Sequence, residues 1–411
     1  MSRPGNDGGR SQAAPPGLDA VLAREGWAYA SSPPVSADDP GRFHALFGRD
    51  SLILALQVLP RRPDVARATL RAHAARIGRH EDPITLEEPG KVIHEWRDAP
   101  PPVLVERGWP ADERPFASYA TTDATAWFLV VLARLGDPAL VMELEPAWRA
   151  AGGWLERALE RGGGLVRHAP GARRAGLLQQ GWRDAVDPAD PRDGGGGILH
   201  RDGRTPAPRL ADADTQAVAS AALRALTALD PADPGSRSAA DALRARIAGA
   251  FDPETMAVEP DGTRVRGAGS QLGWLLWADA LPPGPARAAA DRLCAPDVLT
   301  PYGPRTLASS EPHFNAYAYH RGSVWPFDAW LAWGGLRAAG RAREAERVRA
   351  GTLDALRRLG DAPELYAVTG DPPAPERVAL ANRVQTWTIG ARLALEAGWD
   401  GRPDPSPDAP G

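Results

Sequence analysis

The hydrophobic positions of this chain recur mainly at helical spacing. Stretches rich in Ala, Leu and Arg carry apolar residues every three to four positions, whereas alternating β-branched segments are almost absent. This pattern predicts a mostly helical protein. The predicted helices are Leu18–Glu25, Ser51–Leu59, Asp64–Ile77, Asp123–Leu135, Met142–Arg161, Asp214–Leu229, Ser236–Phe251, Gln271–Ala280, Pro285–Leu293, Val324–Ala339, Arg341–Leu359 and Gln385–Ala397.

Two kinds of predicted helix alternate along the chain. One kind is apolar on most sides and follows a loop rich in Gly, Asp, Trp, Tyr, Arg or His, whereas the other, such as Arg341–Leu359, is amphipathic. An apolar helix is buried and an amphipathic helix faces solvent, so the alternation predicts an inner and an outer ring of six helices, an all-α (α/α)6 toroid. An α-solenoid is the alternative fold, but no fixed repeat is visible. The inner helices would begin on one face at Asp50, Asp123, Asp214, Gln271, Ser323 and Gln385.

Composition and the two ends set the domain organisation. The chain has 411 residues, of which 43% are hydrophobic and 24% charged, and this excludes wholesale disorder. Residues 1–16 and 401–411 are rich in Pro, Gly and Asp and lack apolar periodicity. We therefore predict disordered tails on either side of a single catalytic domain over residues 17–400.

Several classes of partner are excluded by the same sequence. The net charge of −4 comes without a basic patch, and no apolar run approaches the ~20 residues of a membrane span, so neither nucleic acid nor membrane is expected as a partner. The polar start lacks a secretory signal, so we expect a cytoplasmic protein. The histidines are scattered and Cys294 is the single cysteine, so no metal is predicted. The loop Gly194–Gly197 lacks the Lys-Ser/Thr of a phosphate loop, so no nucleotide cofactor is expected, and the oligomeric state stays open.

Aromatic residues next to carboxylates or donors recur in the loops on the predicted open face. In Tyr319–Pro326, two aromatic side chains flank His320 and Arg321 directly before a predicted helix. Tyr and Trp offer flat apolar faces with one polar group, which suits a sugar ring, and a glycosidase also needs two opposed carboxylates. The other loops of this kind are Phe47–Ser51, His94–Arg97, Tyr119–Asp123, Gly181–Asp184, Ala211–Asp214, Pro363–Tyr366 and Gln385–Trp387.

An ordered set of motifs runs from about Arg42 to Gly398. It consists of Leu46–Ile53, Glu88–Glu95, Thr122–Thr125, Gly181–Asp184, Arg305–Leu307 and Tyr319–Pro326. The set resembles the catalytic (α/α)6 domain of the glycogen debranching, amylo-α-1,6-glucosidase-like family. More distantly it resembles glucoamylase and the clan of processing α-glucosidases and mannosylglycerate hydrolases, the six-hairpin glycosidases. The resemblance implies an inverting hydrolase of α-glucosidic, branch-type bonds.

The chain departs from that family at several points. The β-rich N-terminal domain of full-length relatives is replaced by a short polar tail, Asp212 and Asp214 stand where Glu-Val-Gln-like residues are expected, and Tyr366–Gly370 lacks the usual Gly-Phe continuation. These differences concern substrate size and linkage. A hydrolase of a small glycoside, such as glucosylglycerate or mannosylglycerate, is therefore the alternative.

Two carboxylates are the candidate catalytic residues. The resemblance assigns the general acid to Asp184, and a carboxyl packed beside the Trp182 indole is expected to have a raised pKa. The alternative is that Asp184 has no catalytic role and is a loop aspartate paired with Arg183. The resemblance assigns the general base to Glu364, which would activate a water molecule, and Glu311 is a rival for that role.

The remaining candidates are substrate-binding residues. Asp50 and Glu95 can either accept from free N–H groups at a helix start or bind sugar hydroxyls. For Asp123 and Asp214, helix capping is favoured. We expect an acidic-floored pocket lined by Trp96, Trp182, Trp325 and Trp387, in which alanine variants of Trp182 and Trp325 bind sugar worse without unfolding. The full set of predicted substrate-binding residues is Arg49, Asp50, Glu95, Trp96, Trp182, Arg183, His320, Arg321, Trp325 and Trp387.

Two functions from other classes remain alternatives. A sugar epimerase or isomerase can use the same fold but needs paired histidines near the ring carbons, and here His320 alone is well placed. A carbohydrate-binding protein without catalysis would keep the aromatics and would not need two opposed carboxylates. The distance between the Asp184 and Glu364 carboxyls separates these alternatives, because inversion needs ~6.5–9.5 Å.

Overall fold

The computed structural model describes residues 17–36, 39, 42–106, 109, 112, 114–168 and 176–402. The predicted N-terminal tail and residues 403–411 lie outside these ranges. Gly401 and Arg402, which we assigned to the C-terminal tail, belong to the packed structure: the Arg402 Nε donates to the Trp277 carbonyl at 3.1 Å. No helix in the described ranges is long and apolar enough to cross a membrane.

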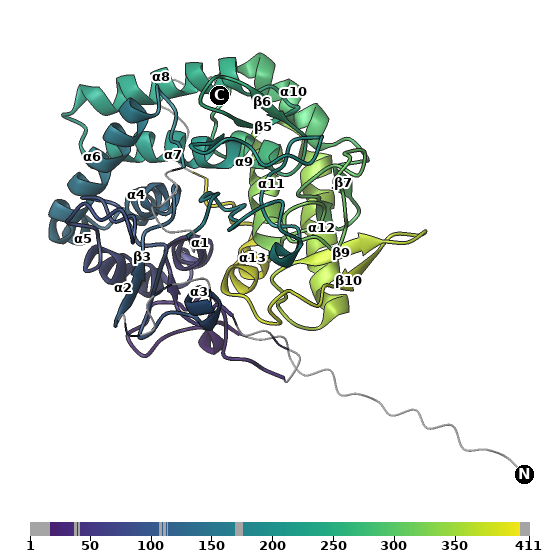
Figure 1. Cartoon of the computed structure of the whole chain (residues 1–411), viewed down its shortest axis with the longest axis horizontal. Coiled ribbons are helices and arrows are strands. Elements are labelled where there is room, and N and C mark those ends of the chain that lie inside the picture. Colours follow the sequence, from purple (N-terminus) through teal and green to yellow (C-terminus); the bar gives the residue numbers. More distant parts are fainter. Residues whose placement is uncertain are drawn as a thin grey trace, which may run out of the picture.

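Six helices of the described chain are buried over most of their length and contact one another in circular order (Figure 1). Their sequences are apolar on most sides, as predicted. In order they are α1 (Gly48–Val58), α4 (Ala124–Leu135), α7 (Ala213–Leu229), α9 (Gln271–Trp277), α11 (Pro326–Ala338) and α13 (Thr386–Ala397), and α13 packs against α1.

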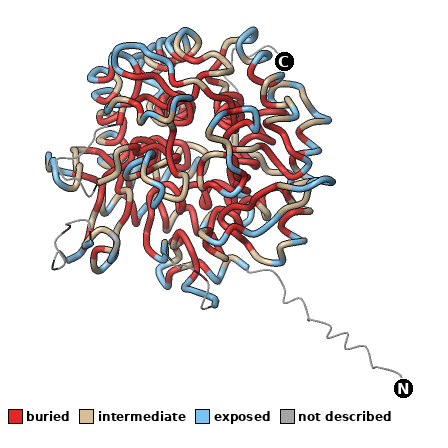
Figure 2. The backbone as a smooth tube through the Cα atoms, turned by 45° about the vertical axis from the view of Figure 1, so that its right-hand side comes forward, coloured by how far each residue is buried: buried red, intermediate tan, exposed pale blue. Residues whose placement is uncertain are grey.

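Amphipathic helices cover this inner set from outside. Each packs against the inner helix that precedes it along the chain and presents its charged side to solvent, so that exposed backbone lies at the periphery and buried backbone inside (Figure 2). These helices are α2 (Pro63–Ala74), α6 (Glu145–Arg161), α8 (Pro234–Ala250), α10 (Pro283–Leu293) and α12 (Ala342–Leu359).

The helix predicted over Leu18–Glu25 is wrong. Leu18–Ala20 (η1) forms a single 3-10 turn, and the chain then folds back on itself through a turn at Gly26, whose φ is +88°. The Ala23 N–H donates to the Trp27 carbonyl at 2.8 Å, which is a hairpin contact and not a helical one. This short hairpin packs over the line where α13 meets α1, in the place that the sixth outer helix was expected to fill.

Proline explains a second difference. The helix predicted over Met142–Arg161 is divided into α5 (Pro138–Glu143) and α6, with Pro146 in the first turn of α6. Proline lacks a backbone N–H and disfavours helical backbone in the residue before it, so a helix begins there more easily than it continues through. A further short helix, α3 (Pro102–Glu106), was not predicted.

Short antiparallel strands connect the helices on the side where the inner helices begin. Two of these pairings lead directly into an inner helix, since β1 precedes α1 and β4 precedes α7. The strands have two to four residues, too few for an alternating pattern to stand out. They form the sheets β1 (Leu46–Phe47) with β2 (Glu95–Arg97) and β3 (Phe116–Ser118), β4 (Ala211–Asp212) with β5 (Thr255–Val258) and β6 (Arg264–Arg266), β7 (Leu299–Thr300) with β8 (Gly303–Pro304), and β9 (Tyr366–Thr369) with β10 (Ala374–Arg377).

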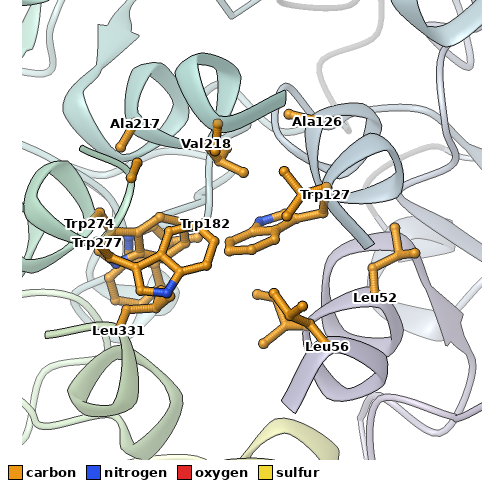
Figure 3. Close-up of a cluster of buried hydrophobic side chains, with 14 of the residues drawn as sticks. Leu52, Leu56, Ala126, Trp127, Trp182, Ala217, Val218, Trp274, Trp277 and Leu331 are labelled. Carbon is orange, nitrogen blue, oxygen red and sulfur yellow. The ribbon is translucent and has the colours of Figure 1, made fainter. Parts of the chain in front are cut away.

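Tryptophan rings fill the centre of the core. In Figure 3, Trp127 of α4, Trp274 and Trp277 of α9 and the loop residue Trp182 lie together among aliphatic side chains of α1, α7 and α11. The Trp182 and Trp274 rings stack with their centroids 5.9 Å apart. The core therefore extends continuously up to the loop that carries Trp182.

Candidate active site

A cavity of about 570 Å³ lies where α1, α11 and α13 begin. We call it the main cavity. Its wall combines carboxylates, aromatic rings and guanidinium groups from segments far apart in the sequence. The predicted site residues that line it are Arg49, Asp50, Glu95, Trp182, Asp184, His320, Trp325, Glu364 and Trp387.

Arg49 connects three segments at the floor of the main cavity. It lies in the first turn of α1 and its side chain is 4% exposed. Its Nε donates to Asp123 Oδ2 at 2.7 Å and its Nη1 to Asp184 Oδ2 at 3.1 Å. Its Nη2 donates to the Gly181 carbonyl at 2.8 Å. Charge-assisted bonds of this kind are strong and directional, so Arg49 fixes the Asp184 loop relative to α1 and α4.

Asp184 is partly open to the main cavity. Its side chain is 25% exposed and pairs with Arg49. The alternative in which Asp184 pairs with Arg183 is therefore wrong. Burial raises the pKa of Asp184 to about 6, although the Arg49 guanidinium opposes this shift. A carboxyl with this pKa keeps its proton in mildly acidic solution, which a general acid requires.

Glu364 faces the same cavity from the loop between α12 and β9. Its side chain is buried, the Tyr319 hydroxyl donates to Oε1, and the Asn382 N–H donates to Oε2 at 3.1 Å. Burial raises the pKa of Glu364 to about 7, although both of these donors oppose the shift. The two donors orient the carboxylate and leave it free of any Arg or Lys ion pair in the described part of the chain.

Asp50 is a third buried carboxyl in this wall. It does not cap α1 through its side chain, and instead accepts a hydrogen bond from Gln385 Nε2 at 2.9 Å. Burial raises the pKa of Asp50 to about 8, with Arg49 opposing and Glu364 and Asp184 adding to the shift. At neutral pH this side chain is therefore mostly a neutral carboxyl, which can both donate to and accept from a sugar hydroxyl.

The aromatic rings of the wall also belong to the core. Trp182, Trp325 and Trp387 are each less than 5% exposed, and the Trp387 ring stacks on Phe327 at 4.1 Å. His320 lies edge-on to Trp182 and stacks on Trp325, and its Nδ1 accepts from the Gly197 N–H at 3.1 Å. Since burial lowers the pKa of His320 well below its usual value, the ring is neutral and carries its proton on Nε2.

Comparison with known proteins identifies the family. Residues 131–388 match the model of the mannosylglycerate hydrolase MGH1-like glycoside hydrolase domain. The chain belongs to this family. This membership makes it a glycoside hydrolase domain. A comparison with curated protein sequences finds no match.

Solved structures share the fold of this MGH1-like domain. GH63 mannosylglycerate hydrolase from Thermus thermophilus, in complex with Tris and D-glycerate, has a TM-score of 0.64 and 18% identity, covering 92% of this chain and 97% of the other. The same hydrolase in complex with glucose has a TM-score of 0.61 and 19% identity, covering 90% and 96%. A structure described as wild-type glycosidase has a TM-score of 0.55 and 14% identity, covering 94% and 95%.

These findings correct the family resemblance that the motifs suggested. The branch that matches is the mannosylglycerate hydrolases, which the motifs placed at a greater distance, and nothing in the comparison supports glycogen debranching. The clan-level expectation of a six-hairpin glycosidase agrees with the matching fold.

Three predicted substrate-binding residues of the MGH1-like domain lie outside the main cavity. Trp96 follows Glu95 in β2 and therefore faces the opposite side of the sheet, where the Arg76 guanidinium lies 4.3 Å from its ring. Arg183 is buried against the Trp182 ring and donates to Ser270 Oγ at 2.8 Å. The Arg321 Nε donates to the Gly195 carbonyl at 3.2 Å. Arg321 also lines the separate, smaller cavity, and Trp96 is half-buried.

The capping predictions for two aspartates are also wrong. Asp123 stands at the start of α4 without a side-chain cap and binds Arg49. Asp212, not Asp214, caps α7, since its side chain accepts from the Thr215 N–H at 2.7 Å. For α7, the residue that accepts from the free N–H groups therefore lies two positions before the predicted one.

Glu311, the rival general base, lies away from the main cavity. Both of its carboxylate oxygens accept from Arg201, at 2.6 and 2.8 Å, in the manner of a structural ion pair. It lines a separate, smaller cavity of about 20 Å³. Within the described ranges, no group of three or more His, Cys, Asp or Glu side chains is placed to hold a metal ion.

Sequence reasoning missed some residues of the wall. Tyr319 was part of the Tyr319–Pro326 motif but was not assigned a role, and its hydroxyl contacts Glu364. Gln385 was expected as a helix start in the Gln385–Trp387 loop and was not assigned a contact, and its amide binds Asp50. The apolar lining residues Ile84, Leu86 and Leu104 gave no signal, because they lie in short segments in which no periodic pattern stands out.

The burial of Trp182 changes the expected effect of removing it. Trp182→Ala should lower the free energy of unfolding by about 3–5 kcal/mol, because the indole packs against other core rings, and should also weaken sugar binding. Urea unfolding and sugar titration by calorimetry measure the two effects. Trp96→Ala is the matched control, because it removes an indole outside the main cavity and should leave sugar affinity unchanged.

Proposed function

We propose that this protein is an inverting hydrolase of a small α-glycoside. The observation that carries the proposal is that Asp184 and Glu364 line one cavity and are held differently, Asp184 by a guanidinium and Glu364 by a phenol and a backbone N–H. The circular order of the six buried helices supports an (α/α)6 toroid, in which such loops converge at one end.

The proposed reaction is a single displacement. Asp184 gives its proton to the glycosidic oxygen as the bond from that oxygen to the anomeric carbon breaks. A water molecule attacks the anomeric carbon from the opposite face and Glu364 takes a proton from it. After the displacement Asp184 is deprotonated and Glu364 is protonated. Proton exchange with solvent returns both residues to their starting protonation states. The product has the opposite anomeric configuration.

The matching relatives suggest the first substrates to try. A solved mannosylglycerate hydrolase with the same fold is described with D-glycerate and with glucose, which makes hexosyl glycerates the first candidates. A cavity of about 570 Å³ suits a small molecule, since such sites are usually about 300–1,000 Å³. We therefore favour a small glycoside over a branched glucan.

A substrate panel with product analysis tests the proposal. Purified protein would be incubated with glucosylglycerate, mannosylglycerate, isomaltose, trehalose and glycogen limit dextrin, and with α-glucosyl and α-mannosyl fluorides. NMR before mutarotation should show a β-sugar from an α-glycoside. Retention of configuration would contradict the mechanism, and a rearranged sugar without net cleavage would favour the epimerase or isomerase alternative.

The pH profile follows from the two carboxyls. The rate requires Asp184 protonated and Glu364 ionised, and burial gives these groups pKa values of about 6 and about 7. At acid pH the base is lost by protonation, and at alkaline pH the acid is lost by deprotonation. We expect kcat/KM to follow a narrow bell with limbs near these two values, measured on the free enzyme.

Tyr319→Phe provides a control for the role of Glu364 in that profile. The Tyr319 hydroxyl lowers the pKa of Glu364, so its removal should raise that pKa. At acid pH, kcat/KM should then fall about tenfold if the pKa of the base rises by about one pH unit. At alkaline pH, where Glu364 is ionised in both proteins, the rates should converge. A uniform loss across the pH range would indicate a structural effect and count against Glu364 as the base.

A further inference from the structure

A chain of hydrogen bonds links Asn382 to two residues that line the main cavity, Gln385 and Asp50. The Asn382 Nδ2 donates to Gln385 Oε1 at 3.1 Å, and the Gln385 Nε2 donates to Asp50 Oδ1 at 2.9 Å. All three residues are buried. Gln385 is the N-cap residue of α13, but its side chain does not cap the helix. Its amide is therefore committed to Asn382 and Asp50.

The direction of this chain is set at its far end. The Arg42 N–H donates to Asn382 Oδ1 at 3.4 Å, and a backbone N–H can only donate. With Oδ1 on that side, the Asn382 NH2 group faces Gln385, and the Gln385 NH2 group faces Asp50. If both amides were reversed, the Asn382 NH2 group and the Arg42 N–H would be two facing donors. The arrangement therefore makes Asp50 Oδ1 an acceptor.

Asp50 is a buried carboxyl without an ion pair in the described part of the chain. The three guanidinium nitrogens of its neighbour Arg49 bond to other acceptors. Within the described ranges, the one hydrogen bond to the Asp50 side chain comes from Gln385. An ionised carboxylate buried with so little compensation is costly, so the neutral form is favoured. Because Oδ1 accepts from Gln385, Oδ1 is the carbonyl oxygen of this neutral carboxyl and the proton lies on Oδ2.

Asn382 also holds the proposed general base. Its N–H donates to Glu364 Oε2 at 3.1 Å, and its carbonyl accepts from the Glu364 N–H at 3.0 Å. One residue therefore contacts Glu364 through its backbone and Asp50 through its side chain and Gln385. The two carboxyls are thus held in a fixed relation to each other.

We propose that Asn382 and Gln385 are positioning residues that present Asp50 to a sugar in the main cavity as a hydrogen-bond donor through Oδ2. Oδ2 has no partner in the described chain, and Asp50 lines the main cavity. The group that it would bind is an acceptor oxygen of the sugar. The inference rests on the part of the proposed function that places a sugar in this cavity.

Deoxyfluoro sugars test the donor. D-glucose and D-mannose, which have no glycosidic bond to cleave, would be titrated by calorimetry at neutral pH beside their 3-, 4- and 6-deoxy and deoxyfluoro analogues. Carbon-bound fluorine can accept a hydrogen bond and cannot donate one, whereas the C–H of a deoxy sugar does neither. At the position that contacts Asp50, the fluoro analogue should bind about two- to fivefold more tightly than the deoxy analogue. We call this ratio the fluoro preference.

The fluoro preference should disappear at alkaline pH. Burial raises the pKa of Asp50 to about 8, so the carboxyl donates below this pH and is an ionised acceptor above it. The charged groups that face Asp50 are Arg49, which stays protonated, and the carboxyls of Asp184 and Glu364, whose pKa values are about 6 and about 7. The loss should therefore have its midpoint near pH 8. A midpoint at pH 7 or below would assign the donor to another group and overturn the inference.

Two variants test the positioning. Asn382→Asp reverses the chain, because a carboxylate accepts from the Gln385 NH2 group and turns the Gln385 carbonyl towards Asp50. The proton of Asp50 then lies on Oδ1, and the fluoro preference should fall to about one or below. Gln385→Met removes the amide at similar volume and should also bring the preference to about one. It decides the question if Asn382→Asp does not fold.

Gln57→Met is the matched control. Gln57 is buried in the same helix as Asp50, does not line the main cavity, and its amide has no hydrogen-bond partner in the described chain. It should leave the fluoro preference unchanged. A purely structural role for Asn382 and Gln385 would weaken the binding of every analogue equally. An unchanged preference in the folded variants would therefore overturn the inference.

The inference and the proposed function can fail separately. Hydrolysis of a glycosyl fluoride with inversion, combined with no fluoro preference in the unaltered protein, would refute the positioning role and leave the proposed function in place. Sugar binding with the expected preference, but without hydrolysis of any glycoside or fluoride, would refute the hydrolase and support the positioning role. Failure to bind any of these sugars would overturn the inference.

Discussion

Asp184→Asn is expected to reduce hydrolysis of a natural or alkyl glycoside by about 10²–10⁴-fold. Asparagine cannot give a proton to the leaving oxygen, and an alkoxide leaves poorly without one. Hydrolysis of the matching glycosyl fluoride should fall much less, because fluoride leaves with little protonation. Steady-state rates on both substrates measure the difference between the two losses.

The fold should survive this substitution. Arg49 keeps its bonds to Asp123 and to the Gly181 carbonyl when Asp184 is changed, so the three segments stay connected. Asp187→Asn is the matched control, since Asp187 is exposed on the same loop and does not line the main cavity. Equal losses on the glycoside and the fluoride would show that Asp184 is not the general acid.

Glu364→Gln is expected to reduce the rate on both substrates by a similar factor, also about 10²–10⁴-fold. The attacking water is needed whatever the leaving group, so a good leaving group does not compensate for the lost base. The glutamine amide also brings its own N–H groups towards the Tyr319 hydroxyl and the Asn382 N–H, which both donate to the carboxylate. Added azide, which needs no base, should restore part of the rate and give a β-glycosyl azide.

Glu311→Gln is the informative control for this variant. The substitution is the same, and Glu311 was the rival candidate, but its oxygens are bound by Arg201 away from the main cavity. We expect it to change stability more than rate. A large rate loss in Glu311→Gln together with normal activity in Glu364→Gln would reverse the assignment.

The helical part of the fold could be predicted because its physical cause is local. An apolar helix such as Ala124–Leu135 and an amphipathic one such as Ala342–Leu359 differ in every turn, and this difference is visible in the sequence. The N-terminal hairpin could not be predicted in the same way. Leu18–Glu25 has helical composition, and the turn at Gly26 together with contacts to α1 and α13 decides its conformation.

The site shows the same division between local and long-range causes. Arg49, Asp184 and Glu364, which the motifs singled out, line one cavity. Trp96 was assigned to the wrong side because the face of a three-residue strand depends on its partners β1 and β3. The pairing of Tyr319 with Glu364 joins residues 45 positions apart, and no local pattern indicates it.

The contact between α1 and α13 has a consequence for how the chain reaches this structure. These two helices lie near opposite ends of the sequence, and the Thr386 N–H donates to the Ala30 carbonyl at 2.9 Å beside their junction. During synthesis, α13 is made long after α1, so α1 lacks this neighbour over most of that time. Every residue of α1 is buried in the finished protein, so that interval leaves an apolar helix flank exposed to solvent. Until Thr386–Ala397 is available, this exposed flank favours aggregation of the nascent chain.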